Sequence, residues 1–513
     1  MKKVHLFILF TFVFSAMTQA QISSDLLRKA NNGDAAAMNL VGKAYMDGDG
    51  VKQNYEEAIR WFTKAADKGY AISMTSIGNI YYRISEYSSA KEWYEKAVRA
   101  GDEKAKCWLG QLYEYGFGVD PDYAKAMDLY LEMAQKGMVS AIGNIGRLYE
   151  YGHGVPQDYT KAIEWYQKAA DKGDEGAMFR IGILYFNGHG VGQDYSKAYE
   201  WFLKSAAKGE PAAMNRIGNL YYDGLGVEKD YAKAMEWYKK AANKGSDWAA
   251  FNIGNIYYNG NGVEKDYTQA MEWYKKAADK GNASAMGWIG YFYHYGIGVK
   301  QDYAQALEWY KKADNNGCDW AAYNIGNIYY SGNGVEQDYV QAMEWYKKAV
   351  DKGNAAAMTA VGNLLFDGYG VDQSYAEAME WYQKSADKNY IPGIYNVGYM
   401  YFYGHGVPQD YEKAFNYFTQ ASGTGYGLSI GKLGEMYYNG YYVQQDYEKA
   451  FELLKKAAEA TDTPSGSAMK RLSDCYRFGK GTTKDLEKAE YWLKKAQETG
   501  SDEARAIQQL MGM

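Results

Sequence analysis

The sequence predicts an all-α chain built as a solenoid of repeated helix pairs, and three observations support this fold class. A glycine returns every 36 residues along most of the chain, with one shorter step of 32 residues between Gly78 and Gly110. Each copy of the repeat holds two runs of apolar residues at helical spacing. A Gly-x-Gly loop separates the two runs in eleven copies. Self-similarity at such a period indicates stacked units, none of which can bury its apolar face alone.

The recurring glycine lies in the first helix of each unit, and we number the repeats by it. A thirteenth repeat carries Ser473 at this position. The twelve glycines are Gly42, Gly78, Gly110, Gly146, Gly182, Gly218, Gly254, Gly290, Gly326, Gly362, Gly398 and Gly434.

The sixth repeat, residues 212–245, illustrates the expected unit. Asp230 stands just before the second helix, where its carboxylate is expected to cap exposed backbone N–H groups. Gly245 is expected to end that helix in a left-handed conformation. A glycine inside a helix costs roughly 1 kcal/mol relative to alanine. The recurrence of Gly218 therefore predicts close packing, with the second helix approaching at Ala234.

Tryptophan recurs in the second helix of most repeats. Together with the tyrosines at the positions of Tyr221 and Tyr231, these tryptophans are predicted to supply most of the buried area of the core, and not a cofactor site. They are Trp61, Trp93, Trp165, Trp201, Trp237, Trp273, Trp309, Trp345, Trp381 and Trp492.

The repeat as a whole reads A-x-x-x-I/L-G-x-x-Y-x-x-G-x-G-V-x-x-D-Y-x-x-A-x-x-W-Y-x-x-A-A-x-x-G. This pattern resembles the Sel-1-like repeat, a relative of the tetratricopeptide repeat with a longer loop between its helices. The resemblance covers nearly all of residues 34–500, in thirteen copies. It implies a right-handed superhelix of antiparallel helix pairs that acts as an adaptor for other proteins.

The two ends of the chain differ from the repeats. Residues 1–20 combine two lysines, an apolar run and small residues before Ala20, which is typical of a secretory signal peptide. We therefore expect an exported protein, periplasmic or extracellular, that has no stable membrane insertion after cleavage. Residues 21–33 and 501–513 read as single helices that cap the N-terminal and C-terminal ends of the stack.

Several function classes are disfavoured by composition. The net charge of −6 argues against nucleic-acid binding, which needs a basic stripe. The three cysteines fall in distant repeats, so no disulfide framework is expected, and we expect no metal and no cofactor. Ser-x-x-Lys sequences, as in β-lactamases, begin among other places at Ser88, Ser205 and Ser385. Because the partner motif K-T-G is missing, we expect a non-enzymatic protein and keep a β-lactamase-like enzyme as a distant third function.

The resemblance also implies a binding groove. In the related tetratricopeptide units, five positions of the first helix face the concave side: six and three before the glycine, then one, four and five after it. Carried onto this chain, these positions hold large aromatic side chains and asparagines in the middle repeats, which are common anchors of binding surfaces. The groove residues predicted in this way are Trp248, Phe251, Asn255, Tyr258, Tyr291, His294, Trp320, Tyr323, Asn327, Tyr330, Asn219, Asn363, Tyr395 and Tyr399.

The sequence leaves two questions about this groove open. An extended protein partner is the expected ligand, but stacked aromatic rings beside asparagine amides also suit the sugars of a glycan or of peptidoglycan. The same aromatic residues could instead pack between neighbouring first helices and leave little surface for a ligand.

Overall fold

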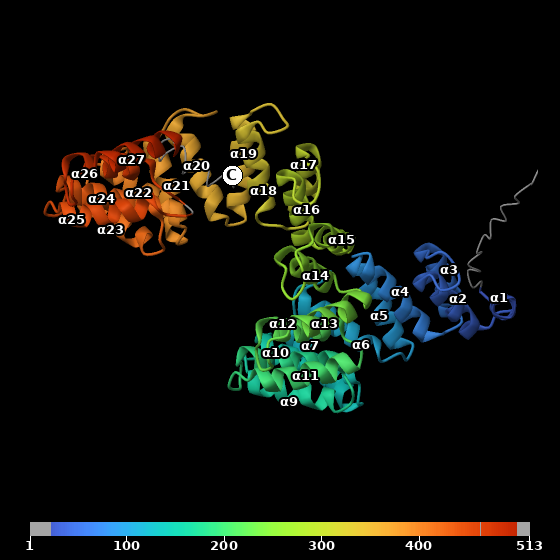
Figure 1. Ribbon diagram of the computed structural model, residues 1–513. Helices are drawn as coiled ribbons and strands as arrows, with labels where there is room; N and C mark the ends of the chain where they lie inside the picture. The colour runs from blue at the N-terminus through green and yellow to red at the C-terminus, as the bar shows by residue number, and fades with distance from the viewer. Residues whose placement is uncertain (1–21, 462, 500–513) are drawn as a thin grey trace, which may run out of the picture. The chain divides into compact units, whose positions relative to one another are not determined.

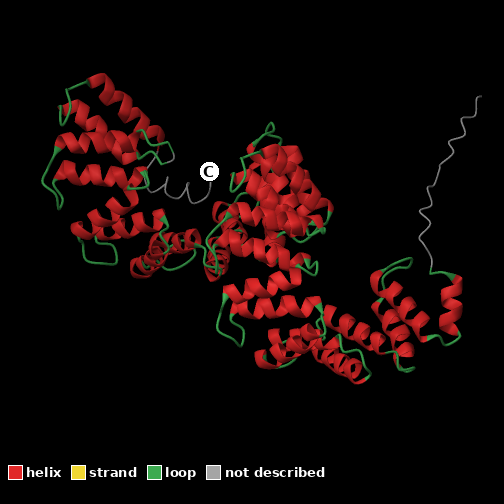
Figure 2. Cartoon of the chain, turned by 90° about the horizontal axis from the view of Figure 1, so that it is seen from below, coloured by secondary structure: helices red, strands yellow, loops and turns green. Residues whose placement is uncertain are grey.

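The computed structural model describes residues 22–461 and 463–499, which form 27 α-helices and no strand (Figure 2). The predicted all-α fold is thereby confirmed. The predicted signal peptide and the predicted C-terminal capping helix lie outside the described residues. The helices group into two units, one up to Lys244 and one from Gly245 onward.

The first unit contains α1 to α13 (Figure 1). Its helices are α1 Ser24–Asn31, α2 Ala35–Asp47, α3 Tyr55–Ala66, α4 Ala71–Arg83, α5 Tyr87–Arg99, α6 Ala105–Tyr115, α7 Tyr123–Gln135, α8 Val139–Tyr151, α9 Tyr159–Ala170, α10 Glu175–Asn187, α11 Tyr195–Ala207, α12 Pro211–Asp223 and α13 Tyr231–Asn243.

The second unit contains α14 to α27. Its helices are α14 Asp247–Asn259, α15 Tyr267–Ala278, α16 Ala283–Tyr295, α17 Tyr303–Asn315, α18 Ala321–Ser331, α19 Tyr339–Asp351, α20 Ala355–Asp367, α21 Tyr375–Asp387, α22 Ile391–Tyr403, α23 Tyr411–Ser422, α24 Gly427–Asn439, α25 Tyr447–Ala458, α26 Gly466–Phe478 and α27 Leu486–Thr499.

Each repeat consists of an even-numbered helix, here called its A helix, followed by an odd-numbered B helix. Within each unit, a helix packs mainly against the helices just before and just after it in the chain. In places, consecutive A helices also touch, as α20 and α22 do. The predicted helix cap is confirmed, because Asp230 accepts a hydrogen bond of 2.9 Å from the backbone N–H of Lys233.

The recurring glycine allows one aromatic ring of the B helix to reach the backbone of the A helix. A Cβ atom added at Gly146 would lie 2.8 Å from Cδ1 of Tyr166. In the sixth repeat, the side chain facing Gly218 is Tyr238, one turn beyond the predicted Ala234. The buried ring, and not a close approach of the two backbones at an alanine, is therefore the reason for the glycine.

The helix α8 offers a matched pair of substitutions that tests this reason. Gly146→Ala is expected to destabilise the fourth repeat by about 1–3 kcal/mol, because the methyl group overpacks the Tyr166 ring. Gly143→Ala lies in the same helix, where the nearest atom would be 3.9 Å from the new Cβ, and is expected to stabilise by about 0.4–1 kcal/mol. Hydrogen exchange in α8 and α9 measures both effects, and equal effects of the two substitutions would contradict the packing argument.

The recurrent tryptophans occupy a different place from the one predicted. Nine of the ten are half-buried, and only Trp492 is buried. In the nine repeats, a lysine three residues later holds its Nζ atom 3.9 to 4.7 Å from the centre of the tryptophan ring. The fully enclosed ring is the tyrosine or phenylalanine that follows the tryptophan, such as Tyr274 or Phe202. The tryptophans thus cover the edge of the core and stack with cations.

Candidate binding surface

The core tyrosines of the B helices find hydrogen-bond acceptors on the A helices. In five repeats, the tyrosine hydroxyl donates a bond of 2.8 Å to Oδ1 of the asparagine that follows the glycine. The pairs are Tyr94–Asn79, Tyr238–Asn219, Tyr274–Asn255, Tyr346–Asn327 and Tyr382–Asn363. Because a buried hydroxyl without a partner is costly, these asparagines serve the core first.

In three other repeats, the partner of the tyrosine hydroxyl lies one turn later in the A helix. The hydroxyl of Tyr130 donates to Glu114 at 2.9 Å, and that of Tyr166 donates to Glu150 at 2.6 Å. In the eighth repeat, the hydroxyl of Tyr310 lies 3.4 Å from Nδ1 of His294. Repeats one, five and eleven carry phenylalanine as the enclosed ring and have no asparagine after the glycine.

The predicted groove residues divide by exposure. Trp248 is 53% exposed on α14 and stacks edge-to-face on Phe251, with ring centres 5.9 Å apart. His294, Asn327 and Tyr395 are buried, which corrects their expected place on an open surface. The remaining members are partly buried: Asn219, Phe251, Asn255, Tyr258, Tyr291, Trp320, Tyr323, Tyr330, Asn363 and Tyr399.

Several of these rings pack against aromatic residues of neighbouring A helices, as the second open possibility anticipated. Tyr258 lies 4.9 Å from Trp288, and Trp320 lies 6.4 Å from the same ring. Trp320 also packs edge-to-face on the enclosed Tyr310, at 5.9 Å. The two predicted tryptophan anchors therefore differ, since Trp248 is open to solvent and Trp320 is part of the packing.

Burial decides the charge of His294. Desolvation lowers the pKa of this histidine to about 4, so the ring is neutral at pH 7. Desolvation also raises the pKa of the thiols of Cys107, Cys318 and Cys475 to about 11 each. These thiols are buried and protonated at neutral pH, which makes them poor nucleophiles.

A buried lysine was missed at the sequence level. The ammonium group of Lys432 on α24 donates to the hydroxyl of Tyr403 at 2.7 Å and to Glu435 at 3.1 Å. It also lies 5.7, 5.1 and 4.9 Å from the ring centres of Tyr399, Phe402 and Tyr403. The predicted groove residue Tyr399 thus belongs to an aromatic cage that a cation of the same chain already fills.

A second charged cluster joins repeats three and four. The Arg147 guanidinium donates two hydrogen bonds, of 2.9 and 2.8 Å, to the buried Glu114 carboxylate. The same guanidinium lies over the ring of the exposed Tyr115, 5.3 Å from its centre. One repeat further, Arg180 donates to the hydroxyl of Tyr151 at 2.9 Å. Arginine and tyrosine therefore alternate along consecutive A helices.

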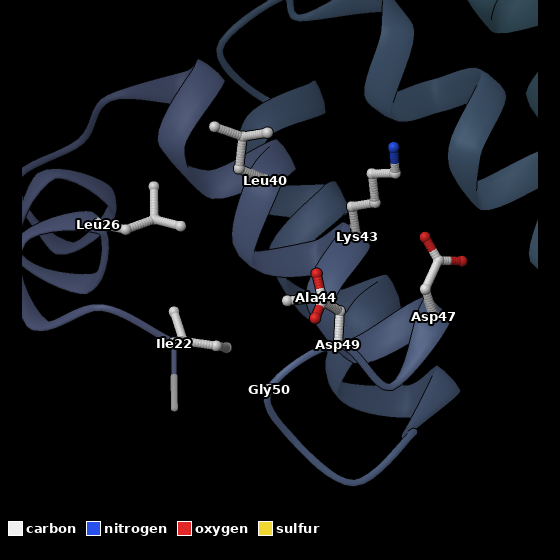
Figure 3. A pocket seen from close by; sticks show the side chains of 8 residues that line it. All are labelled: Ile22, Leu26, Leu40, Lys43, Ala44, Asp47, Asp49 and Gly50. Carbon is white, nitrogen blue, oxygen red and sulfur yellow. The ribbon is translucent and has the colours of Figure 1, made fainter. Parts of the chain in front are cut away.

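A cleft of about 430 Å³ lies at the N-terminal end of the first unit (Figure 3). Ile22 and Leu26 lie on one side, Leu40 lies on α2, and Asp49 and Gly50 of the loop that follows α2 also line the cleft. The lining carries no serine, cysteine or histidine. The described residues also contain no group of three potential metal ligands, and no helix among them is both long and apolar enough to cross a membrane.

Comparison with known proteins identifies the family. The Sel1 repeat model matches thirteen segments of the chain, so the protein belongs to the Sel1 repeat family, as the resemblance indicated. The matched residues are 35–70, 84–102, 104–138, 139–174, 176–210, 211–246, 249–282, 283–317, 321–354, 355–390, 391–423, 429–462 and 466–498. Sel1 repeats generally form non-enzymatic scaffolds, and proteins that carry them bind protein partners.

Curated relatives share only part of their length with this chain. The putative sel1-like repeat-containing protein L21 of Acanthamoeba polyphaga mimivirus is 27% identical over 86 residues, which are 17% of this chain and 16% of the relative. The ERAD-associated E3 ubiquitin-protein ligase component HRD3B of Arabidopsis thaliana is 31% identical over 100 residues, 18% of this chain and 15% of the relative. The chain thus matches about a sixth of the length of each.

A solved structure is similar over almost the whole chain. The protein c5321, a protective antigen present in uropathogenic Escherichia coli strains, displays an SLR fold. It is 29% identical with a TM-score of 0.55, and the comparison covers 95% of this chain and 97% of that one.

Proposed function

We propose that this protein is an exported scaffold that binds an extended protein partner along its A-helix surface. By this surface we mean the side chains on α14, α16, α18, α20 and α22. The observation that carries the proposal is Trp248, the largest type of side chain, which is 53% exposed on α14 and supported by Phe251. Half-exposed aromatic residues on a rigid helix are the usual anchors of protein interfaces.

A protein partner has more support than a glycan. The expected sugar contacts relied on asparagine amides as both donors and acceptors, but Oδ1 of Asn255 and of Asn363 accepts from a core tyrosine. An exposed Trp248 still suits stacking on a sugar ring, so a glycan remains the second candidate. Family membership favours the protein partner, because Sel1 repeat proteins bind proteins.

Two of the Ser-x-x-Lys serines named above give little support to an enzymatic function. Ser205 and Ser385 are buried, and their hydroxyls donate at 2.8 Å to the backbone carbonyls of Glu175 and Ala355. These hydroxyls join neighbouring helices and have no access to a substrate.

Trp248→Ala tests the proposal. A random 12-residue peptide library displayed on phage is selected against the folded wild-type protein, and the affinity of the recovered peptides is measured with each variant. We expect Trp248→Ala to weaken binding by about 2 kcal/mol, or about thirtyfold in Kd, because an exposed anchor is removed. Circular dichroism should show unchanged helicity.

Tyr491→Ala is the matched control, since Tyr491 is 52% exposed on a B helix, α27. We expect it to leave the affinity unchanged. Equal binding by Trp248→Ala and the wild type would exclude the A-helix surface around α14. Selection of glycans but no peptides in a parallel array would favour the second candidate.

A further inference from the structure

Asp367, the last residue of the A helix α20, carries a carboxylate without a partner among the described residues. Its side chain is partly buried, yet it makes no hydrogen bond and no ion pair with any group in the described part of the chain. Desolvation raises the pKa of this carboxyl above its ordinary value. An ionised carboxylate in such a place destabilises the folded chain unless a cation approaches it.

Aromatic residues lie in the neighbourhood of this carboxylate, since Tyr382 bonds to Asn363, one turn before Asp367 on α20. After burial, the negative charge of Asp367 is the largest cause that raises the pKa of Tyr330 and of Tyr382. The hydroxyl of Tyr382 is already engaged by Asn363. Nearby, the half-exposed Tyr369 stacks on Tyr339 with ring centres 4.9 Å apart. The surroundings of Asp367 thus combine negative charge with ring faces, a combination that attracts organic cations.

The chain itself shows what fits the corresponding place in other repeats. Lys432 lies two residues before the glycine of repeat twelve and binds Tyr403, five residues after the glycine of repeat eleven. Arg180 has the same relation to Tyr151 between repeats five and four. Asp367 lies five residues after Gly362 and so corresponds to Tyr403 and Tyr151. Asn396, two residues before the glycine of the next repeat, corresponds to Lys432 and Arg180.

At this junction, no cation among the residues that the structure describes pairs with Asp367. Asn396 replaces the lysine or arginine, and its Nδ2 donates to Asn363 at 3.3 Å. The negative charge of Asp367 is therefore not compensated by this neighbour, whereas Tyr403 and Tyr151 at the same position each contact a cationic side chain.

We propose that Asp367, one turn after Asn363 on α20, receives a lysine or arginine side chain of the extended protein partner. The partner cation takes the place that Lys432 and Arg180 fill from within the chain at other junctions. A single carboxylate provides too few ligands for a metal ion, which favours an organic cation. This inference rests on the proposed function, and it adds the chemistry of one partner residue.

Parallel peptide selections test the inference. The same 12-residue phage library is selected against the wild type, Asp367→Asn and the control Asp223→Asn, whose acid stands at the same repeat position but is exposed on α12. We expect lysine or arginine to be enriched at one peptide position with the wild type and with Asp223→Asn, and this enrichment to disappear with Asp367→Asn.

A double-mutant cycle then locates the contact. Replacing the enriched lysine by norleucine, or Asp367 by asparagine, should each weaken binding about tenfold or more, and the two changes together should cost little beyond either one. Hydrogen exchange in α20 and α21 should show Asp367→Asn to be at least as stable as the wild type, because the substitution removes a partly buried charge that has no partner among the described residues.

The remaining outcomes contradict the inference in distinguishable ways. Recovery of peptides without cationic enrichment, or additive effects in the cycle, would overturn the role of Asp367 and leave the proposed function standing. Recovery of no peptide by the wild type would contradict both. A clear loss of stability in Asp367→Asn would show that the carboxylate has a structural partner and would also overturn the inference.

Discussion

Tyr274→Ala is expected to lower the free energy of unfolding of repeats seven and eight by about 3–5 kcal/mol. Tyr274 is fully enclosed, and its ring meets the backbone at Gly254, where an added Cβ would lie 2.5 Å from Cε1. It also packs against Phe251 and Phe292, each 5.6 Å away between ring centres. Truncation removes the residue that joins three helices and leaves a cavity among them.

Tyr274→Phe separates the ring from its hydroxyl. This variant keeps the ring and loses only the bond to Asn255, so we expect a cost of about 1 kcal/mol. Hydrogen exchange is the appropriate measurement, because repeat arrays can open locally and a single melting temperature then mixes several events. The loss of protection should concentrate in α14, α15 and α16. Uniform loss along the chain, or equal effects of the two variants, would contradict the expectation.

Arg147→Met is the second substitution with a large expected effect, again about 3–5 kcal/mol. It leaves the Glu114 carboxylate buried without the two hydrogen bonds that now neutralise it. The Tyr130 hydroxyl still donates to this carboxylate, but a single neutral donor does not offset the loss of two hydrogen bonds from a charged guanidinium. Protection in α6 and α8 should fall.

The double variant Arg147→Met with Glu114→Gln provides the control. Glutamine keeps an acceptor for Tyr130 and removes the uncompensated charge, so most of the lost stability should return. If the double variant is as unstable as Arg147→Met alone, the arginine contributes through packing on Tyr115 and not through charge.

The period of the sequence was sufficient to predict the helix pairs, because a glycine inside a helix needs a reason that recurs with it. It did not show which neighbouring aromatic residue fills the space. Trp273 and Tyr274 are adjacent in the chain, and helical periodicity alone cannot decide which of two adjacent residues points deeper. A lysine three residues after the tryptophan was the available signal, since it marks the ring that remains near solvent.

The role of the asparagines could also have been read from the sequence. Asparagine follows the glycine only where the enclosed ring is tyrosine, and repeats with Phe62, Phe202 and Phe418 have other residues there. Lys432 was harder to find, because one lysine in an A helix resembles any surface residue. Its cage consists of rings about thirty positions earlier, and only the folded chain brings these α22 rings to the lysine on α24. The unpaired state of Asp367 likewise depends on a neighbour that lacks a cation.

The succession of contacts, each helix mainly with the helix before and after it, has a mechanical meaning. A pull along the chain is carried by the repeats of a unit in series, so each bears the same tension and the weakest yields first. One repeat of 36 residues that unfolds would release a segment of chain that is about 120 Å long when fully extended. Its neighbours would keep their own buried rings. A scaffold of this kind can lengthen under load and still hold what is bound to its intact repeats.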